Sequence, residues 1–384
     1  MNALLVIALL PTYLIRFSLF GIPTTVLEIL LLIVIGQWLC KNHRRIKSLF
    51  RIPRTWAIAI ALIVIAATVS AIITPNAFSG LGIWKAYFIE PILFFYLLLD
   101  ELKQKKITVD QILFALVLGG FVPALTAIAQ WIFNAGIPIP WDIERRVTGV
   151  FDYPNALGLY LGPLIVIAVG TLKKNKLFFA IALVLFSIAI ILAQSEAAIA
   201  ATIITVVLMG IAQPSLRKKT LIISVMAVGL IFVIPQTRAF LIPKLTLQDY
   251  SGQIRIGQWS ETLELLKNRP LLGAGLSGYP EALKPYHTQT HIEIFQYPHT
   301  IFLNIWVELG LLGLASFLIV ATLLLRSLPI LLPTSYFLLP FPLLQTFLHG
   351  LVDVPYFKND LAIMTWVFLS VFLYAIHLQK SQNT

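Results

Sequence analysis

The sequence predicts an all-α polytopic membrane protein of about 12 transmembrane helices with a large outer loop that carries short amphipathic helices. Of its 384 residues, 59% are hydrophobic and only 12% are charged. Apolar runs of roughly 17–25 residues, the length that crosses the hydrocarbon core of a bilayer, recur along the whole chain. We therefore expect residues 1–384 to form one integral membrane domain.

The apolar runs define the expected spans. Residues 2–20 lack a basic start and a small-residue cleavage site, so we expect a mature span here and not a signal peptide. The single cysteine, Cys40, leaves no disulfide framework or thiolate metal site. The expected spans, in chain order, are 2–20, 23–40, 55–73, 84–99, 109–134, 154–171, 177–193, 196–212, 220–235, 298–321, 331–351 and 359–378.

Four short basic segments give the expected orientation. They fall on the same side of the membrane if the spans alternate, and loops rich in lysine and arginine face the cytoplasm. We therefore expect a protein of the cytoplasmic (inner) membrane with both termini in the cytoplasm. The four segments are 41–54, 103–106, 173–176 and 217–219.

Two longer loops fall on the opposite, outer side. Residues 135–153 form the first, and residues 236–297 form the large outer loop between two spans. An amphipathic helix is expected over residues 252–267, lying in the membrane interface and limited by Pro270. Its apolar residues at helical spacing are Ile256, Trp259, Leu263 and Leu266.

Charged residues within the apolar runs are costly in a bilayer and are usually functional. On the expected topology almost all of them lie in the outer half of the membrane. An ion pathway would distribute such groups through the full thickness, whereas a chemical site open to the outer leaflet would gather them at one depth. For each of them, a paired structural charge remains the alternative. They are Arg16, Glu28, Lys85, Glu90, Glu196, Glu308 and Asp353.

Arginines of the outer loops are candidates for phosphate binding. Arg145 and Arg146 stand just before a span that opens at Asn155, and a guanidinium binds phosphate oxygens bidentately. Arg255 lies one turn before Trp259. Arg146 and Arg255 could form a two-sided clamp on a diphosphate. The alternative is that these arginines meet lipid headgroups at the interface.

His299 is the only histidine at the outer start of a span. A neutral imidazole can accept a proton near neutral pH, although a capping or interfacial role is the other interpretation. His287 and His291 have i, i+4 spacing but no acid or cysteine at ligand spacing, so we expect no metal site. The segment 269–280 has the glycine spacing of a dinucleotide fingerprint but no preceding strand, so its glycines should shape a tight loop.

Taken in order, these segments resemble the O-antigen ligase and polymerase superfamily. The resemblance covers roughly residues 140–360, and its most specific element is the histidine followed at fixed spacing by two glycines. Two positions depart from the usual pattern: Thr300 stands where Asn, Ser or Gln is usual, and Glu196 where Arg is common. The segments are Arg146–Asn155, Ser195-Glu196, Arg255 with Trp259, Pro270–Gly275, His299 with Gly310 and Gly313, and "HGLVDVPYF" (349–357).

Members of this superfamily move a glycan from a polyprenyl-diphosphate carrier to an acceptor hydroxyl outside the cytoplasmic membrane. The resemblance implies that His299 is the catalytic base and that Arg146 and Arg255 bind the donor diphosphate, without metal or cofactor. The implied partners are the lipid-linked glycan donor, a glycolipid, glycan or other surface acceptor, and the lipid bilayer, with no nucleic acid. The possible supporting residues are Arg145, Asn155, Glu196, Trp259, Gly273, Gly275 and Asp353.

Several functions stay open at this point. A ligase and a polymerase share these motifs, and they differ in whether the acceptor is a surface molecule such as lipid A–core or a second lipid-linked repeat unit. A flippase of lipid-linked glycan would line a cavity through both leaflets with polar residues, whereas this chain keeps its inner half apolar. A structural scaffold leaves the outer charges unexplained. Glu308 is too deep to reach a sugar and receives no firm role.

Overall fold

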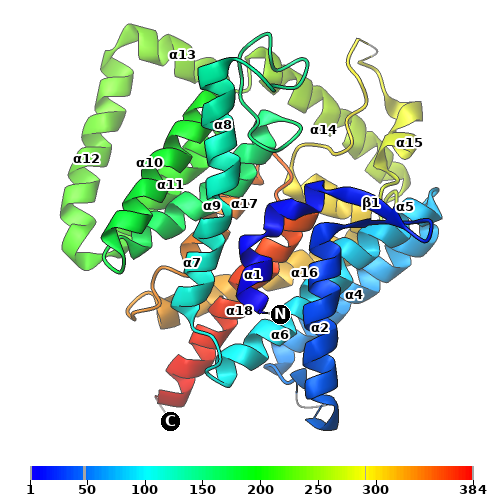
Figure 1. Ribbon diagram of the computed structural model, residues 1–384. Coiled ribbons are helices and arrows are strands. Elements are labelled where there is room, and N and C mark those ends of the chain that lie inside the picture. The colour runs from blue at the N-terminus through cyan, green and yellow to red at the C-terminus, as the bar shows by residue number, and fades with distance from the viewer. Residues whose placement is uncertain (1, 46–48, 290, 383–384) are drawn as a thin grey trace.

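The computed structural model describes residues 2–45, 49–289 and 291–382, and these residues are mostly helical (Figure 1). Its N-terminal half contains α1 (Ala3–Ala8), η1 (Leu10–Leu14), β1 (Arg16–Leu19), β2 (Ile22–Thr25), α2 (Val26–Lys41), η2 (His43–Arg45), α4 (Arg54–Ile73), α5 (Ala77–Ile83), η3 (Trp84–Ile89), α6 (Glu90–Lys103), α7 (Val109–Gly119), α8 (Phe121–Phe133) and α9 (Pro154–Thr171). The remainder contains α10 (Lys176–Leu192), α11 (Glu196–Ala212), α12 (Pro214–Val233), α13 (Pro235–Leu245), α14 (Tyr250–Asn268), α15 (Tyr279–Leu283), η4 (Lys284–Tyr286), α16 (Ile301–Leu331), α17 (Pro340–His349) and α18 (Asn359–Gln382).

Six helical segments of the described chain are long and apolar enough to cross a membrane. Two shorter apolar helices, α10 and α11, accompany them. A helical membrane protein is therefore confirmed, while the count of about 12 spans stays a prediction. The six segments are Arg54–Ile73, Ala77–Lys103, Val109–Phe133, Pro154–Thr171, Ile301–Leu331 and Asn359–Ser381.

The expectation of one continuous span over residues 2–20 is wrong. Helix α1 ends at Ala8, the 3₁₀ helix η1 follows, and β1 then pairs with β2 in an antiparallel hairpin. Pro11 lacks the backbone N–H that a longer helix would need. Phe20 and Gly21 both have positive φ, which suits a two-residue hairpin turn. Arg16 therefore lies on an exposed strand and not within a span.

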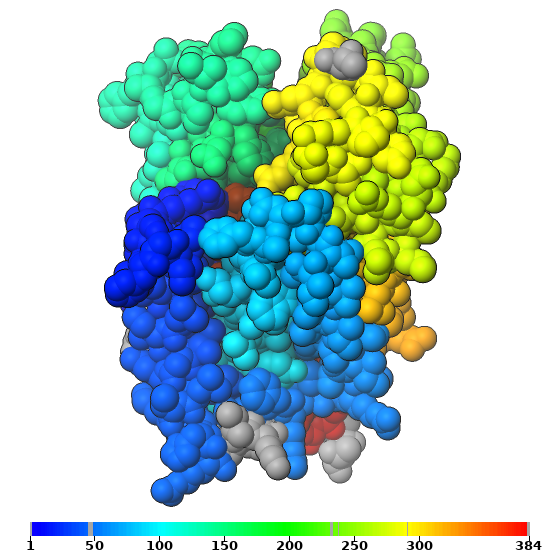
Figure 2. All heavy atoms as spheres, turned by 90° about the vertical axis from the view of Figure 1, so that its right-hand side faces the viewer, coloured from blue at the N-terminus to red at the C-terminus, as the bar shows by residue number. Residues whose placement is uncertain are grey.

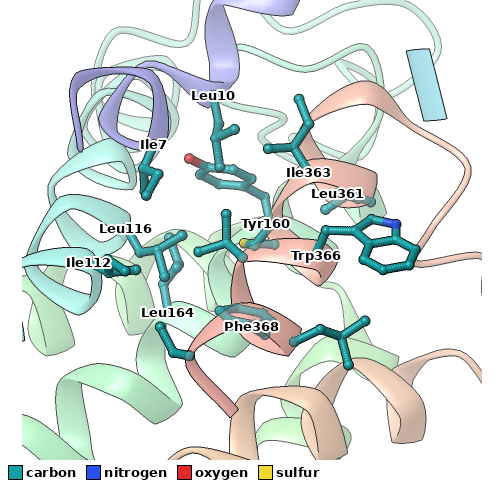
Figure 3. Packing of buried hydrophobic residues seen from close by; sticks show 14 of the residues in the cluster. Ile7, Leu10, Ile112, Leu116, Tyr160, Leu164, Leu361, Ile363, Trp366 and Phe368 are labelled. Carbon is teal, nitrogen blue, oxygen red and sulfur yellow. The ribbon is translucent and has the colours of Figure 1, made fainter. Parts of the chain in front are cut away.

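The core lies where α1, η1, α7, α9 and α18 meet (Figure 3). Tyr160 of α9 is fully buried at the centre of this cluster, between Leu10 of η1 and residues of α18. Helix α9 also packs against α10, α11 and α17, while α16 packs against α4 and α18 against α6. This packing places the starts of α16 and α18, and the turn before α18, at fixed positions.

Lys85 is the cationic partner of two carboxylates that lie within the apolar runs. Its ammonium pairs with Glu28 of α2 and lies 4.0 Å from Glu90, at the start of α6. Both carboxylates are buried, and a buried charge without a partner is strongly destabilising. The structural alternative therefore explains Lys85, Glu28 and Glu90.

Figure 1 shows the loop over residues 135–153 and helices α13, α14 and α15 at one end of the molecule. The C-terminus and the turn between α6 and α7 lie at the opposite end. The basic segment 103–106 falls on this turn. The two long loops therefore lie together, as the sequence predicts.

Candidate functional site

A cleft opens at the end of the molecule that carries the long loops. Figure 2 shows it between the green segment around residue 140 and the yellow segment that precedes α16. The orange-red stretch just before α18 is visible at its floor. Three parts of the chain that are far apart in sequence therefore surround one opening.

His299 and Asp353 come together at this cleft. His299 immediately precedes the cap of α16, and its Nδ1 lies 3.7 Å from the Oδ1 of Asp353, in the turn between α17 and α18. The amide of Ile301 donates a 2.8 Å hydrogen bond to the carbonyl of Gly350, which joins the start of α16 to this turn. The imidazole is 30% exposed, so one side of the ring stays open to a substrate.

The Asp353 carboxylate is buried between two imidazoles. Its Oδ2 lies 3.9 Å from the Nε2 of His349, and its Oδ1 accepts a 2.8 Å hydrogen bond from the amide of Val354. Burial alone would raise the pKa of Asp353, but His299, His349 and the amide of Val354 together lower it below its ordinary value. Asp353 is therefore a carboxylate at neutral pH. A carboxylate beside Nδ1 favours a proton on that nitrogen and leaves Nε2 free to accept one.

Helix α14 holds the segment that carries His299. Residues 297–299, which we call the strap, receive two hydrogen bonds from α14: Gln258 donates to the carbonyl of Tyr297 and the indole of Trp259 to that of Pro298, both at 2.8 Å. His299 itself has a φ of 47°, a left-handed conformation that the surroundings must maintain. Trp259 is therefore part of this support.

The amphipathic helix expected over residues 252–267 is confirmed as a helix. Half of its buried residues are polar, namely Gln258, Glu261 and Thr262, and they lie beside the buried Leu265 and Leu266. Ile256 and Leu263 remain 43% and 44% exposed. Gln258 donates to the strap, whereas Glu261 accepts from residues 287–289 and Thr262 bonds Tyr279. Apolar periodicity does not reveal that these backbone and side-chain groups need polar partners.

Arg255 stands one turn before Trp259 on α14. Among the described residues it has no hydrogen-bond or ion-pair partner, and its side chain is half-buried. It is close enough to His349 for their charges to interact. A partly buried guanidinium without a partner can bind an anion bidentately.

Arg146 lies in the loop on the other side of the cleft. Its Nε donates to the carbonyl of Ala193 at 3.2 Å and its Nη2 to that of Gln194 at 3.4 Å, so it ties the loop to the end of α10. The guanidinium stacks over Trp141 at 5.0 Å and lies 3.8 Å from Glu144. Arg146 thus has partners of its own, in contrast to Arg255.

Arg145 points elsewhere. It has a φ of 51°, donates to the carbonyl of Trp131 at 3.0 Å and stacks on that indole at 4.4 Å. These contacts lie on α8 and not on α14 or the strap. They fit the interfacial alternative better than a place in the clamp.

Asn155 and Glu196 join neighbouring helices. The side-chain oxygen of Asn155 accepts a 3.1 Å hydrogen bond from Ser195, which connects the start of α9 to the start of α11. Glu196 forms an ion pair with Lys244 of α13. The acid therefore has a lysine of the large outer loop as its partner, at the position where the superfamily that the sequence resembles often has arginine.

Gly273 and Gly310 let two main-chain segments pass within hydrogen-bonding distance. Both have positive φ, and a Cβ would lie 2.4 Å from the carbonyl oxygen of Val307 at Gly273 and 2.3 Å from that of Leu271 at Gly310. The amide of Leu311 donates to the carbonyl of Leu271 at 2.9 Å across this contact. The glycines therefore shape a tight loop, and Gly310 interrupts the helical geometry of α16.

Gly275 and Glu308 complete this junction with α4. A Cβ at Gly275 would approach Thr74 to 2.9 Å, and Ser70 donates to the main-chain carbonyl of Glu308. The carboxylate of Glu308 accepts a 2.7 Å hydrogen bond from the amide of Ser277. The buried side chain of Glu308 thus links α16 to the glycine loop. This structural contact is the role that its position in the sequence did not reveal.

Glu261 forms a second polar centre that the sequence did not reveal. It accepts hydrogen bonds from the amide and hydroxyl of Thr288, the amide of Gln289 and the imidazole of His287, at 2.7 to 3.1 Å. Burial alone would raise the pKa of Glu261, but these hydrogen bonds lower it below the ordinary value, and the bond to Glu261 raises the pKa of His287. This cluster orders the loop that leads to the strap.

Comparison with known proteins supplies one finding. Residues 181–318 match the family model described as O-antigen ligase. The matched part contains Arg255, Trp259 and His299, whereas Arg146 and Asp353 lie outside it. A search of curated proteins finds no match.

Proposed function

We propose that this chain, of which residues 181–318 match the O-antigen ligase family model, moves a glycan from a polyprenyl-diphosphate carrier to an acceptor hydroxyl on the outer face of the cytoplasmic membrane. The observation that carries the proposal is the pairing of His299 with the buried carboxylate of Asp353, beside helix α14, on which Arg255 stands one turn before Trp259. This arrangement supplies a base and a cation at one opening, which is what transfer from a diphosphate carrier requires.

The proposed reaction needs one proton transfer. The acceptor hydroxyl attacks the anomeric carbon of the donor sugar, the bond from that carbon to the phosphate oxygen breaks, and the polyprenyl diphosphate leaves with the bonding electrons. Nε2 of His299 takes the hydroxyl proton as the new glycosidic bond forms. Asp353 holds the ring and stabilises the imidazolium, the role of the third member of a catalytic triad.

The arginines act on the leaving group. As the bond to phosphate breaks, negative charge grows on the bridging oxygen, and a preorganised cation stabilises that charge. Arg255 has the free guanidinium for this task. Arg146 is held on the other side of the cleft by hydrogen bonds and an ion pair of its own. We therefore expect it to bind mainly the phosphate group that lies farther from the sugar.

Reconstitution with a defined polyprenyl-diphosphate oligosaccharide tests the proposal. Transfer of one glycan to a lipid A–core acceptor indicates a ligase, a ladder of longer glycans on the carrier indicates a polymerase, and transport across the bilayer without a new bond indicates a flippase. His299→Gln is the matched variant: turnover should fall by roughly 10²–10⁴ while donor binding is retained. No new glycosidic bond with the wild-type protein, or full turnover in His299→Gln, would overturn the proposal.

The orientation is part of the proposal. With Cys40 replaced, a single cysteine at Lys284 should react with a membrane-impermeant maleimide in intact cells, and one at Lys105 should react only after permeabilisation. The opposite pattern would place the cleft on the cytoplasmic side.

A further inference from the structure

A groove lies between the end of α14, the loop that follows it and the start of α16. Its volume is about 340 Å³. It opens on a different side of α14 from Gln258 and Trp259, which bond to the strap. The groove is therefore a separate feature from the cleft at His299. Its lining includes Ser260, Leu263, Glu264, Lys267, Pro270 and Trp306.

The walls of the groove are apolar and exposed. Leu263 is exposed, and Leu271 and Leu272, which follow Pro270 directly, are 67% and 52% exposed. The indole of Trp306 closes the opposite wall, where its Nε1 donates to the carbonyl of Pro270 at 2.7 Å. A contiguous group of exposed apolar side chains marks a surface that contacts a partner or a lipid.

These leucines lie against α16, one of the six segments that are long and apolar enough to cross a membrane. The amide of Leu311 donates to the carbonyl of Leu271 at 2.9 Å, and Leu311 and Leu312 are themselves exposed. Beyond this contact, residues 311–331 provide about the 20 residues that the core of a bilayer requires. Leu271 and Leu272 therefore continue the lipid-facing surface of α16 at the level where the helix leaves the hydrocarbon core.

Cations accompany the apolar residues of this segment. Lys267 and Arg269 precede Pro270, and both are exposed. Lys267 pairs with Glu264 at 2.6 Å, whereas the guanidinium of Arg269 has no partner among the residues that the structure describes. Two cations and one acid leave the segment with a net positive charge, which attracts anionic lipids. A guanidinium also binds phosphate oxygens bidentately.

We propose that this groove binds one anionic phospholipid of the surrounding bilayer. An acyl chain packs along Leu263, Pro270 and Trp306. The phosphate lies on Arg269, with Lys267 beside it. The bound lipid fixes the end of α14 to the membrane, and α14 is the helix that donates hydrogen bonds to the strap. The site takes no part in the proposed transfer reaction, so its test does not depend on that reaction.

A spin label measures whether the segment enters the bilayer. In a Cys40→Ser background, a nitroxide is attached to Leu271→Cys, and the protein is reconstituted in vesicles of equal parts phosphatidylcholine and phosphatidylglycerol. The label should collide with dissolved oxygen more often than with a water-soluble nickel complex, because oxygen concentrates in hydrocarbon. The same label on Lys284→Cys, at an exposed residue of the same outer loop, should show the opposite preference.

Native mass spectrometry of protein taken from these vesicles identifies the bound lipid. Phosphatidylglycerol should remain bound to the wild-type protein. Arg269→Gln should weaken its binding about fivefold, the effect of one cation at an anionic membrane surface, and Glu264→Gln should strengthen it by a similar factor because it removes the acid. Lys284→Gln is the matched control and should bind as wild type, since its ion pair with Glu281 does not line the groove.

Ser260→Trp separates the groove from other lipid contacts of this basic protein. The indole fills the groove, so one bound phosphatidylglycerol should be lost while the others remain. An unchanged number of bound lipids in this folded variant overturns the proposal, and so does a label on Leu271→Cys that collides mainly with the nickel complex. Loss of a copurified polyprenyl diphosphate in place of phosphatidylglycerol assigns the groove to the donor and also overturns it. If Ser260→Trp does not insert, equal binding by wild type and Arg269→Gln overturns it.

Discussion

Replacing Asp353 by asparagine tests the core of the proposed mechanism with little change of shape. The carboxylate is 5% exposed and its Oδ1 lies 3.7 Å from Nδ1 of His299. At an effective dielectric of about 20, two unit charges at that separation attract each other by about 4 kcal/mol. The imidazole is 30% exposed, and water should reduce the attraction to roughly half. The imidazolium that forms during transfer therefore loses about 2 to 4 kcal/mol of stabilisation.

This loss corresponds to a fall in turnover of roughly thirtyfold to a thousandfold. Donor binding should stay within about twofold, because the proposed mechanism assigns the binding of the diphosphate to Arg146 and Arg255 and not to Asp353. The acid limb of the pH–rate profile should move to lower pH, because the carboxylate no longer attracts a proton to His299. A lower maximal turnover together with an acid limb at lower pH distinguishes the loss of the Asp353 charge from a general loss of folded protein.

Single-turnover transfer in proteoliposomes, measured from about pH 5 to pH 8 where an imidazole titrates, gives both quantities. Donor binding is measured separately on the same preparations. Asp142→Asn, which neutralises an exposed aspartate of the outer loop, is the matched control and should behave as wild type. Unchanged turnover and an unmoved acid limb in folded Asp353→Asn would refute the assigned role, and so would a loss confined to donor binding.

Three further predictions concern α14. Arg255→Ala should lower transfer by on the order of a hundredfold, and Arg255→Lys should recover only part of it because an ammonium cannot bind bidentately; full activity of the lysine variant would leave Arg255 as an anchor. Trp259→Phe removes one hydrogen bond to the strap, worth about 1 kcal/mol, so turnover should fall about fivefold. The control Trp306→Phe loses a comparable hydrogen bond to the carbonyl of Pro270 and should not change turnover. Equal effects of the two variants would contradict a special role for Trp259. Because the folded pKa of Glu261 is depressed, its stabilisation is present above the ordinary carboxyl pKa near 4.5 and lost as pH falls through the lower value. Glu261→Gln should therefore speed hydrogen exchange of the Thr288 amide about tenfold at neutral pH, and an unchanged rate would refute the role of the carboxylate.

Local sequence was sufficient to predict a helical membrane protein and to select candidate site residues. Apolar runs of membrane length predict helices, because a segment in lipid must satisfy its own backbone hydrogen bonds and a helix does so. The same local reasoning identified His299 by its place at the outer start of a span. It failed at residues 2–20, where one proline and a turn at Phe20-Gly21 outweighed the hydrophobicity of the run.

Only the tertiary structure decided which of these residues act together. Asp353 is 54 positions from His299 in sequence, yet the turn before α18 brings the two side chains to 3.7 Å. In the sequence Trp259 is one of the apolar residues of an amphipathic helix, but its hydrogen bond to the strap depends on where α14 packs. Helix formation depends on neighbours three or four positions apart, whereas the site depends on contacts between segments that the chain leaves far apart until the core closes.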